Sequence, residues 1–80
     1  MFSKKLFGER LHNVRTEHGE TQLALAQALG VGKSQVSEME NGKKTTTAEK
    51  IALICEHYNI SSDYLLGLTD DPEPKGQKKR

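Results

Sequence analysis

The 80-residue sequence has few of the residues from which secreted, membrane or catalytic domains are usually built. It contains a single cysteine, Cys55, which cannot form an internal disulfide, so we expect a reducing compartment. No apolar run approaches the length of a membrane span or of the apolar part of a signal peptide, which predicts a cytoplasmic protein. Tryptophan is missing, and Phe and Tyr occur only twice each. So short a chain needs its apolar residues for one core, which leaves no volume for a roomy catalytic cleft.

A large excess of charge of one sign is also missing, since 12 basic and 11 acidic residues give a formal net charge of +1. The charges are nevertheless distributed unevenly. Residues 1–44 have a small basic excess, residues 45–74 contain only Lys50 as a basic residue among several acidic ones, and residues 75–80 are basic again. A phosphate backbone senses local charge, because physiological salt screens interactions beyond about 8 Å. The small total therefore does not exclude a nucleic-acid partner.

Hydrophobic residues recur at helical spacing, and no segment shows the alternation of a strand. The first predicted helix covers residues 3–18. The second begins after a threonine cap at Thr21 and ends at Gly30. Only three residues separate it from the third helix, which ends at Asn41-Gly42. So short a connection predicts a sharp angle between the second and third helices.

A fourth helix follows a run of threonines, and either Thr46 or Thr47 is a suitable cap for it. A short fifth helix is capped by Ser61 or by its neighbour Ser62, and Ile60 is expected to be buried before it. The core stripe of the fourth helix is predicted to consist of Ala48, Ile51, Ile54, Cys55 and Tyr58.

The segment after Thr69 contains charged residues, two prolines and no apolar residue, a composition that predicts disorder. Its basic end is either an arm that touches DNA or an inert tail, and the sequence leaves both open. We therefore predict an all-α fold: one compact five-helix domain with a helix-turn-helix over residues 1–69, followed by a disordered polar and basic tail over residues 70–80.

The third predicted helix exposes a polar face, although a small chain has little core to spare. Val36 and Met39 are its only plainly apolar residues, and we expect them to hold it to the core. A sharp turn followed by a helix with a polar outer face is the arrangement that places a helix in the DNA major groove. Its outward residues offer hydrogen-bonding groups to base edges: Lys33, Ser34, Ser37 and Glu38.

Residues 21–44, TQLALAQALGVGKSQVSEMENGKK, and residues 45–67, TTTAEKIALICEHYNISSDYLLG, carry several further motifs together. They open on Thr21-Gln22 and end on the sequence DYLLG. Together they resemble the helix-turn-helix domain of the lambda-type phage repressor family, and the resemblance covers residues 6–67. It implies a lambda repressor-like fold and a non-enzymatic, sequence-specific regulator of transcription that binds double-stranded DNA, in most cases a repressor.

The resemblance also implies roles for single residues. Gln22 matches a residue that binds a phosphate and braces the third helix. Arg15 matches an arginine that forms a structural ion pair with Glu40 and lies close to the DNA backbone, and a purely structural role weighs equally. The base-reading positions match Lys33, Ser34, Ser37 and Glu38, and the positions that contact the DNA backbone match Gln22, Gln35, Asn41, Lys43, Lys44 and Arg15.

Two positions depart from the family pattern. Leu23 stands where members usually have a polar residue, so we expect an exposed apolar side chain. Gly32 replaces the usual Ser or Thr cap of the third helix, and glycine is a slightly weaker cap.

One helix reads only a few base pairs, so we expect a homodimer on a palindromic operator. We expect the dimer interface to involve Tyr64 and Leu68 around the fifth helix, and the alternative is that both side chains belong to the core. A second reading is an antitoxin-like interaction module with a partner protein and secondary DNA binding, which an exposed Leu23 and the acidic second half would suit.

No residue pattern points to catalysis, a cofactor or a metal. The sequence has no Ser-His-Asp set and no glycine-rich phosphate loop. His12, His18 and His57 share no spacing typical of a metal site, and Cys55 fits a core position better than a nucleophile. We therefore predict that the chain is not an enzyme and has no cofactor and no metal site.

Overall fold

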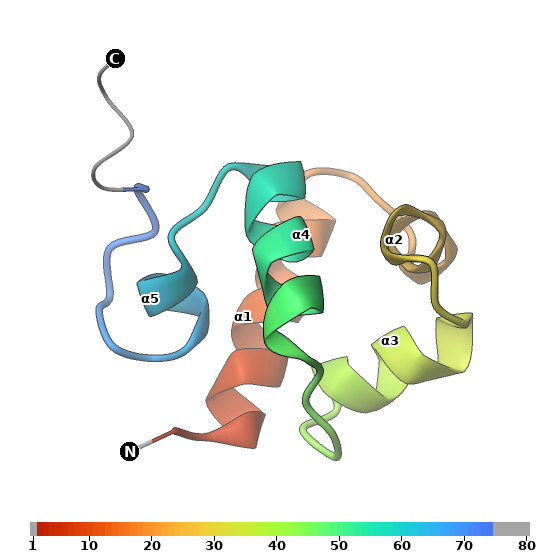
Figure 1. Ribbon diagram of the computed structural model, residues 1–80, viewed down its shortest axis with the longest axis horizontal. Helices are drawn as coiled ribbons and strands as arrows, with labels where there is room; N and C mark the ends of the chain where they lie inside the picture. Colours follow the sequence, from red (N-terminus) through yellow and green to blue (C-terminus); the bar gives the residue numbers. More distant parts are fainter. Residues whose placement is uncertain (1, 75–80) are drawn as a thin grey trace.

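In the computed structural model, which describes residues 2–74, the chain folds into five α-helices, and these residues contain no strand. α4 crosses in front of α1, α2 and α3 lie to one side of this pair, and α5 lies to the other (Figure 1). The predicted all-α, five-helix fold is confirmed. The helices are α1 (Lys4–Glu17), α2 (Gln22–Leu29), α3 (Lys33–Glu40), α4 (Ala48–Tyr58) and α5 (Ser62–Leu65).

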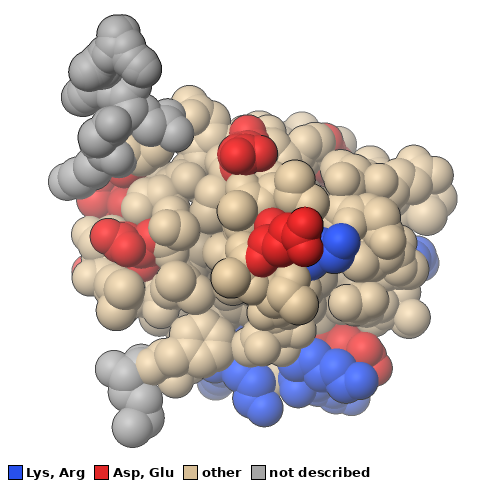
Figure 2. Space-filling view, viewed as in Figure 1, with Lys and Arg blue, Asp and Glu red and all other residues tan. Residues whose placement is uncertain are grey.

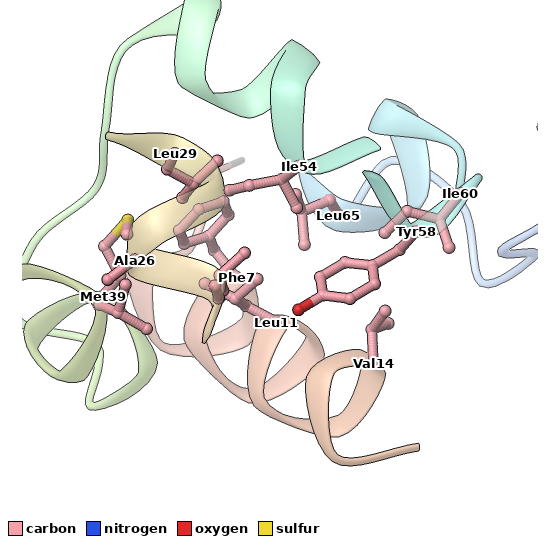
Figure 3. Close-up of a cluster of buried hydrophobic side chains, with 12 residues drawn as sticks. Phe7, Leu11, Val14, Ala26, Leu29, Met39, Ile54, Tyr58, Ile60 and Leu65 are labelled. Atoms are coloured by element: carbon pink, nitrogen blue, oxygen red, sulfur yellow. The ribbon is translucent and has the colours of Figure 1, made fainter. Parts of the chain in front are cut away.

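A single apolar core joins the helices (Figure 3). α3 contributes only Val36 and Met39, and both side chains are fully buried. Two anchors are enough because α3 packs on both α1 and α2, so its remaining residues stay free to be polar. The core consists of Phe7, Leu11, Val14, Leu25, Ala26, Leu29, Val36, Met39, Ile54, Tyr58, Ile60 and Leu65.

Local capping sets the helix boundaries. The Thr21 side chain accepts a hydrogen bond from the Ala24 N–H at 3.0 Å and caps α2. Gly30 ends α2 in the left-handed conformation with φ of 72°, which glycine adopts without steric cost, and so permits the short turn into α3. Where the sequence left two candidates, Thr47 caps α4 and Ser61 caps α5.

The predicted core stripe of α4 is only partly buried. Ile54 and Tyr58 are in the core, Ile51 and Cys55 are half-buried, and Ala48 is exposed. The prediction was too wide because α5 has only four residues and covers little of α4. The uncovered side lines an open groove of about 520 Å³ between α4 and α5. Burial is the main cause that raises the pKa of the Cys55 thiol, which favours its protonated form.

Arg10 of α1 holds the segment that follows α5. Its guanidinium group donates to the backbone carbonyl of Thr69 at 2.7 Å and pairs with Asp70 at 2.7 Å. The Ser61 N–H donates to the carbonyl of Pro72 at 2.9 Å. The domain boundary at residue 69 and the disordered tail stay predictions, and residues 75–80 lie outside the described residues. Within residues 2–74, no helix has both the length and the hydropathy needed to cross a bilayer.

The backbones of α1 and α3 approach each other closely at Gly8. A Cβ atom on Gly8 would lie 2.4 Å from the carbonyl oxygen of Met39 and 2.7 Å from that of Glu40. Both neighbours are backbone atoms, which cannot move aside as a flexible side chain can. The absence of a side chain at residue 8 therefore sets the distance between α1 and the end of α3.

We expect Gly8→Ala to destabilise the fold, although alanine favours a helix by roughly 1 kcal/mol over glycine. The added methyl group pushes α3 away from α1, and overpacking of this kind lowers the free energy of unfolding by about 1–3 kcal/mol. Urea unfolding followed by circular dichroism measures the change. Gly32→Ala is the control for an added Cβ without a clash, because a Cβ there meets only the Ser34 hydroxyl at 4.0 Å. Residue 32 caps α3 and alanine is a poorer cap than glycine, so its loss should reflect capping alone and stay under about 1 kcal/mol. A stabilised Gly8→Ala variant would contradict the close approach.

Candidate nucleic-acid interface

The outer face of α3 carries the four residues predicted to read bases. Lys33 and Ser34 are exposed at its N-terminal end, and Ser37 and Glu38 are half-buried one turn later. Gly32 caps the helix without a side-chain hydrogen bond. The four side chains therefore form a polar, accessible surface on α3, which begins directly after the turn.

The segment after α3 folds back on the helix. The Lys43 N–H donates to the carbonyl of Glu38 at 3.0 Å, and Gly42 adopts a φ of 75° that permits this reversal. The Asn41 side-chain amide donates to the Ser37 hydroxyl at 3.5 Å. Lys43 and Lys44 are exposed, and the Lys44 ammonium lies 3.8 Å from the Glu38 carboxylate. The predicted backbone-contacting residues of this segment thus lie beside the predicted base-reading face.

A buried carboxylate at the end of α3 joins three helices. The Arg15 Nε and Nη2 atoms donate to the two Glu40 oxygens at 2.5 and 3.0 Å, and the exposed fractions of the two side chains are 9% and 3%. Gln22, the first residue of α2, donates its side-chain amide to Glu40 Oε1 at 3.0 Å. Arg15 Nη1 also donates to the carbonyl of Glu20 at 2.6 Å. Because these donors of Arg15 have partners inside the protein, the geometry favours its structural role.

The hydrogen bonds of this network set the protonation of Glu40. Burial alone would raise the pKa of this carboxyl group, but hydrogen bonds from Arg15, Gln22 and His12 outweigh burial and lower the pKa. The hydrogen bond to Glu40 in turn raises the pKa of Arg15. Both groups therefore remain charged over a wide range of pH.

His12 is a member of this network that the sequence analysis did not identify. Its Nδ1 atom lies 3.1 Å from Glu40 Oε1, and its side chain is half exposed. The available signal was its position three residues before Arg15, which places both side chains on one face of α1.

A second polar cluster, which the sequence analysis also did not identify, joins Glu20, in the turn before α2, to two residues of α4. The Tyr58 hydroxyl donates to Glu20 at 2.8 Å, and the His57 Nε2 atom lies 2.9 Å from the same carboxylate. The hydrogen bond from Tyr58 lowers the pKa of Glu20, while burial and the same bond raise the pKa of Tyr58. Neither cluster resembles a metal site, and residues 2–74 contain no group of three potential metal ligands.

Positive and negative charges concentrate on different parts of the surface. Most of the Lys and Arg atoms in view lie on the edge below α3 and below the start of α1, with some acidic atoms beside them, whereas most of the Asp and Glu atoms lie over α4 and α5, with some basic atoms among them (Figure 2). Gln35 lies half-buried on α3, between the core and the polar face. Tyr64 and Leu68, the predicted dimer residues, belong to α5 and the turn after it, across α4 from α3 (Figure 1).

Comparisons with known proteins agree on one family. The profile of the family described as "Helix-turn-helix" matches residues 11–65 of this chain. The uncharacterized HTH-type transcriptional regulator YobD of Bacillus subtilis (strain 168) is 36% identical over 74 residues, which cover 92% of this chain and 66% of YobD. Antitoxin PezA of Streptococcus pneumoniae serotype 4 is 31% identical over 62 residues, which cover 78% of this chain and 39% of PezA. This chain thus spans less than two thirds of the length of either relative.

Solved structures give the same result. The P22 c2 repressor, crystallised in complex with a synthetic operator, matches with a TM-score of 0.71 and 28% sequence identity. The match covers 75% of this chain and 91% of the repressor chain.

The network around Glu40 makes a prediction about stability. Glu40→Ala leaves the Arg15 guanidinium buried without its partner, so we expect the free energy of unfolding to fall by about 3–5 kcal/mol. Combining it with Arg15→Ala should cost less than the sum of the single changes. Glu38→Ala is the control on the same helix, because its pair with Lys44 is exposed and should contribute under about 1 kcal/mol. Thermal and urea unfolding of all four variants measures the coupling, and strictly additive losses would contradict it.

Proposed function

Because this chain belongs to the helix-turn-helix family, as its resemblance to lambda-type repressors predicted, we propose that it represses transcription by binding a palindromic operator as a homodimer. The family is a class of non-enzymatic DNA-binding regulators, which confirms the prediction that the chain is not an enzyme. One observation carries the proposal. α3 is held to the core by two buried apolar side chains and by the Glu40 carboxylate, which leaves its outer face polar and accessible.

In this proposal the N-terminal end of α3 enters the major groove. Lys33 donates to the O6 and N7 atoms of guanine, and Glu38 accepts from the N4 amine of cytosine. Ser34 and Ser37 hydrogen bond to neighbouring base edges. The four side chains lie on the accessible face of α3, which supports this assignment.

Phosphate contacts then fix the position of α3 without reading sequence. Lys43 and Lys44 supply the charge, and Asn41 and Gln35 supply neutral hydrogen bonds. Gln22 braces α3 through Glu40 and sits at the N-terminus of α2, where a phosphate is favoured.

We propose that the second copy binds at the turn after α5. Leu68 supports this place, because 70% of its surface is exposed although its backbone N–H is fixed by a 2.7 Å hydrogen bond to the Asp63 carbonyl. Tyr64 contributes less, since it is half-buried and the Arg10 guanidinium already stacks on its ring at 4.2 Å. A partner at this turn leaves α3 free, because α5 and α3 lie on opposite sides of α4 (Figure 1).

A second candidate is an antitoxin-like interaction module. It is supported by the similarity to antitoxin PezA and by Leu23, whose side chain on α2 is 51% exposed. Under this alternative, a partner protein covers Leu23, and DNA binding is secondary.

Selection of bound sequences from random duplex DNA tests the assignment of base-reading residues. We expect Lys33→Ala and Glu38→Ala each to relax specificity at particular positions of the selected site, because a good direct contact contributes about 1–3 kcal/mol of discrimination. Glu49→Ala, which removes an exposed carboxylate from α4, is the control and should leave the selected sequence unchanged. Uniform weakening on all sequences would show that Lys33 and Glu38 do not read bases.

Analytical ultracentrifugation with and without a palindromic duplex tests the dimer. We expect two copies per palindrome, and we expect Leu68→Ala to raise the dimer dissociation constant at least about tenfold, because a buried leucine contributes roughly 1.5–3 kcal/mol. Leu23→Ala is the matched control, since it removes the same exposed side chain from α2. One copy per palindrome at saturation would refute the dimer, and a larger effect of Leu23→Ala would place the interface on α2.

A further inference from the structure

The cations of the described residues differ in their freedom to meet an external anion. The guanidinium group of Arg10 is engaged by backbone carbonyls and Asp70, and that of Arg15 by Glu40. Lys44 pairs with Glu38, but 66% of the lysine side chain remains exposed. Within residues 2–74, the other lysines form no ion pair: Lys4, Lys5, Lys33, Lys43 and Lys50.

Two of these free lysines come from the start of α1 and lie beside the segment that follows α3. A Cβ atom on Gly42 would lie 3.1 Å from the Lys5 Cα and 3.5 Å from its backbone nitrogen. The backbone of Lys5 thus packs against the residue that immediately precedes Lys43 and Lys44. Figure 2 shows Lys and Arg atoms along this edge, both below the start of α1 and below the segment after α3. We call Lys4, Lys5, Lys43 and Lys44 the basic edge.

We propose that Lys4 and Lys5 bind DNA phosphates that flank the base pairs read by α3, and so extend the interface beyond the helix-turn-helix. This inference rests on the proposed function. Both side chains are exposed and the first turn of α1 contains no acidic residue; Glu9 lies one turn after Lys5, but neither lysine forms an ion pair with it. The backbone contact at Gly42 gives these lysines a fixed place beside the proposed phosphate-binding segment.

The position of the basic edge indicates which phosphates it meets. Base contacts in this motif come from the N-terminal part of the recognition helix. Gly42 follows the C-terminal end of α3, so the basic edge lies at the opposite end of the helix from Lys33. The start of α1 also lies beside the turn after α5, because a Cβ atom on Gly67 would lie 3.0 Å from Leu6 Cδ2. In the proposed dimer, which is joined at this turn, Lys4 and Lys5 therefore face the phosphates between the two half-sites, outside the bases that either α3 reads. Lys43 and Lys44 stay beside α3, where Lys44 pairs with Glu38. The contacts of Lys4 and Lys5 add affinity without changing the selected sequence.

Each ammonium group that binds a phosphate displaces counterions, and the plot of log affinity against log salt becomes steeper by about 0.9 per contact. Replacing both Lys4 and Lys5 with glutamine should therefore flatten the slope by up to about 1.8 per protein copy, or about 3.6 for the dimer, and weaken binding most at low salt. The double variant should fold normally, since both side chains are exposed and unpaired; circular dichroism melts verify this.

The experiment measures fluorescence anisotropy over a series of salt concentrations with two duplexes. Both carry the palindromic site selected from random DNA: one is unmodified, and the other has uncharged methylphosphonates in place of the phosphates between the two half-sites. We expect Lys4→Gln/Lys5→Gln to flatten the salt slope on the unmodified duplex and to match the unchanged protein on the methylphosphonate duplex. A normal slope on the unmodified duplex would overturn the inference, as would an equal loss on both duplexes.

Two variants serve as controls. Lys43→Gln/Lys44→Gln should flatten the slope on both duplexes, because these residues contact phosphates within each half-site, beside the bases that α3 reads. Lys50→Gln removes one unpaired lysine from α4 and should leave both slopes unchanged; a matching loss there would show a general effect of net charge and overturn the inference. If the unchanged protein prefers neither duplex over unrelated DNA, the proposed function itself fails, and that result is distinct from a failure confined to Lys4 and Lys5.

Discussion

The buried carboxylate of Glu40 is the interaction on which the arrangement of α1, α2 and α3 depends. One carboxyl group accepts hydrogen bonds from Arg15 of α1 and from Gln22 at the start of α2, and it ends α3 itself. A carboxylate with an exposed side-chain fraction of only 3% costs free energy unless all its partners are present. The network therefore fixes the angle of α3 in a way that apolar contacts, which have no direction, cannot.

The hydrogen bonds of Glu40 explain how α3 is held in place by so small a core while its outer face stays uncovered. Val36 and Met39 are the only buried apolar side chains of α3, and the absence of a side chain at Gly8 allows the α1 and α3 backbones to touch. Close packing, a left-handed glycine in the turn and one shared carboxylate replace the extra apolar residues that a larger domain would use. The outer face of α3 is thus available for hydrogen-bonding groups at no cost to the core.

The division of charge follows from the same architecture. Within residues 2–74, Arg10 and Arg15 donate to carbonyls and carboxylates of the fold, whereas Lys4, Lys5, Lys33 and Lys43 are exposed and form no ion pair. Because α4 and α5 carry the acidic second half of the chain, the surface around α3 is the one that favours a polyanion (Figure 2). The near-zero net charge of the chain conceals this arrangement.

The sequence by itself determined the features that depend on neighbouring residues: the five helices, the cap at Thr21, the short turn at Gly30 and the polar face of α3. Capping and helical periodicity act within about one turn, so they can be read along the chain. The pairing of Arg15 with Glu40 came from family resemblance. Only the tertiary structure added His12 to that pair, joined Glu20 to Tyr58, left half of the α4 stripe uncovered and brought Lys5 against Gly42. These contacts join residues far apart in sequence, and they depend on how closely the helices cross, which no local pattern specifies.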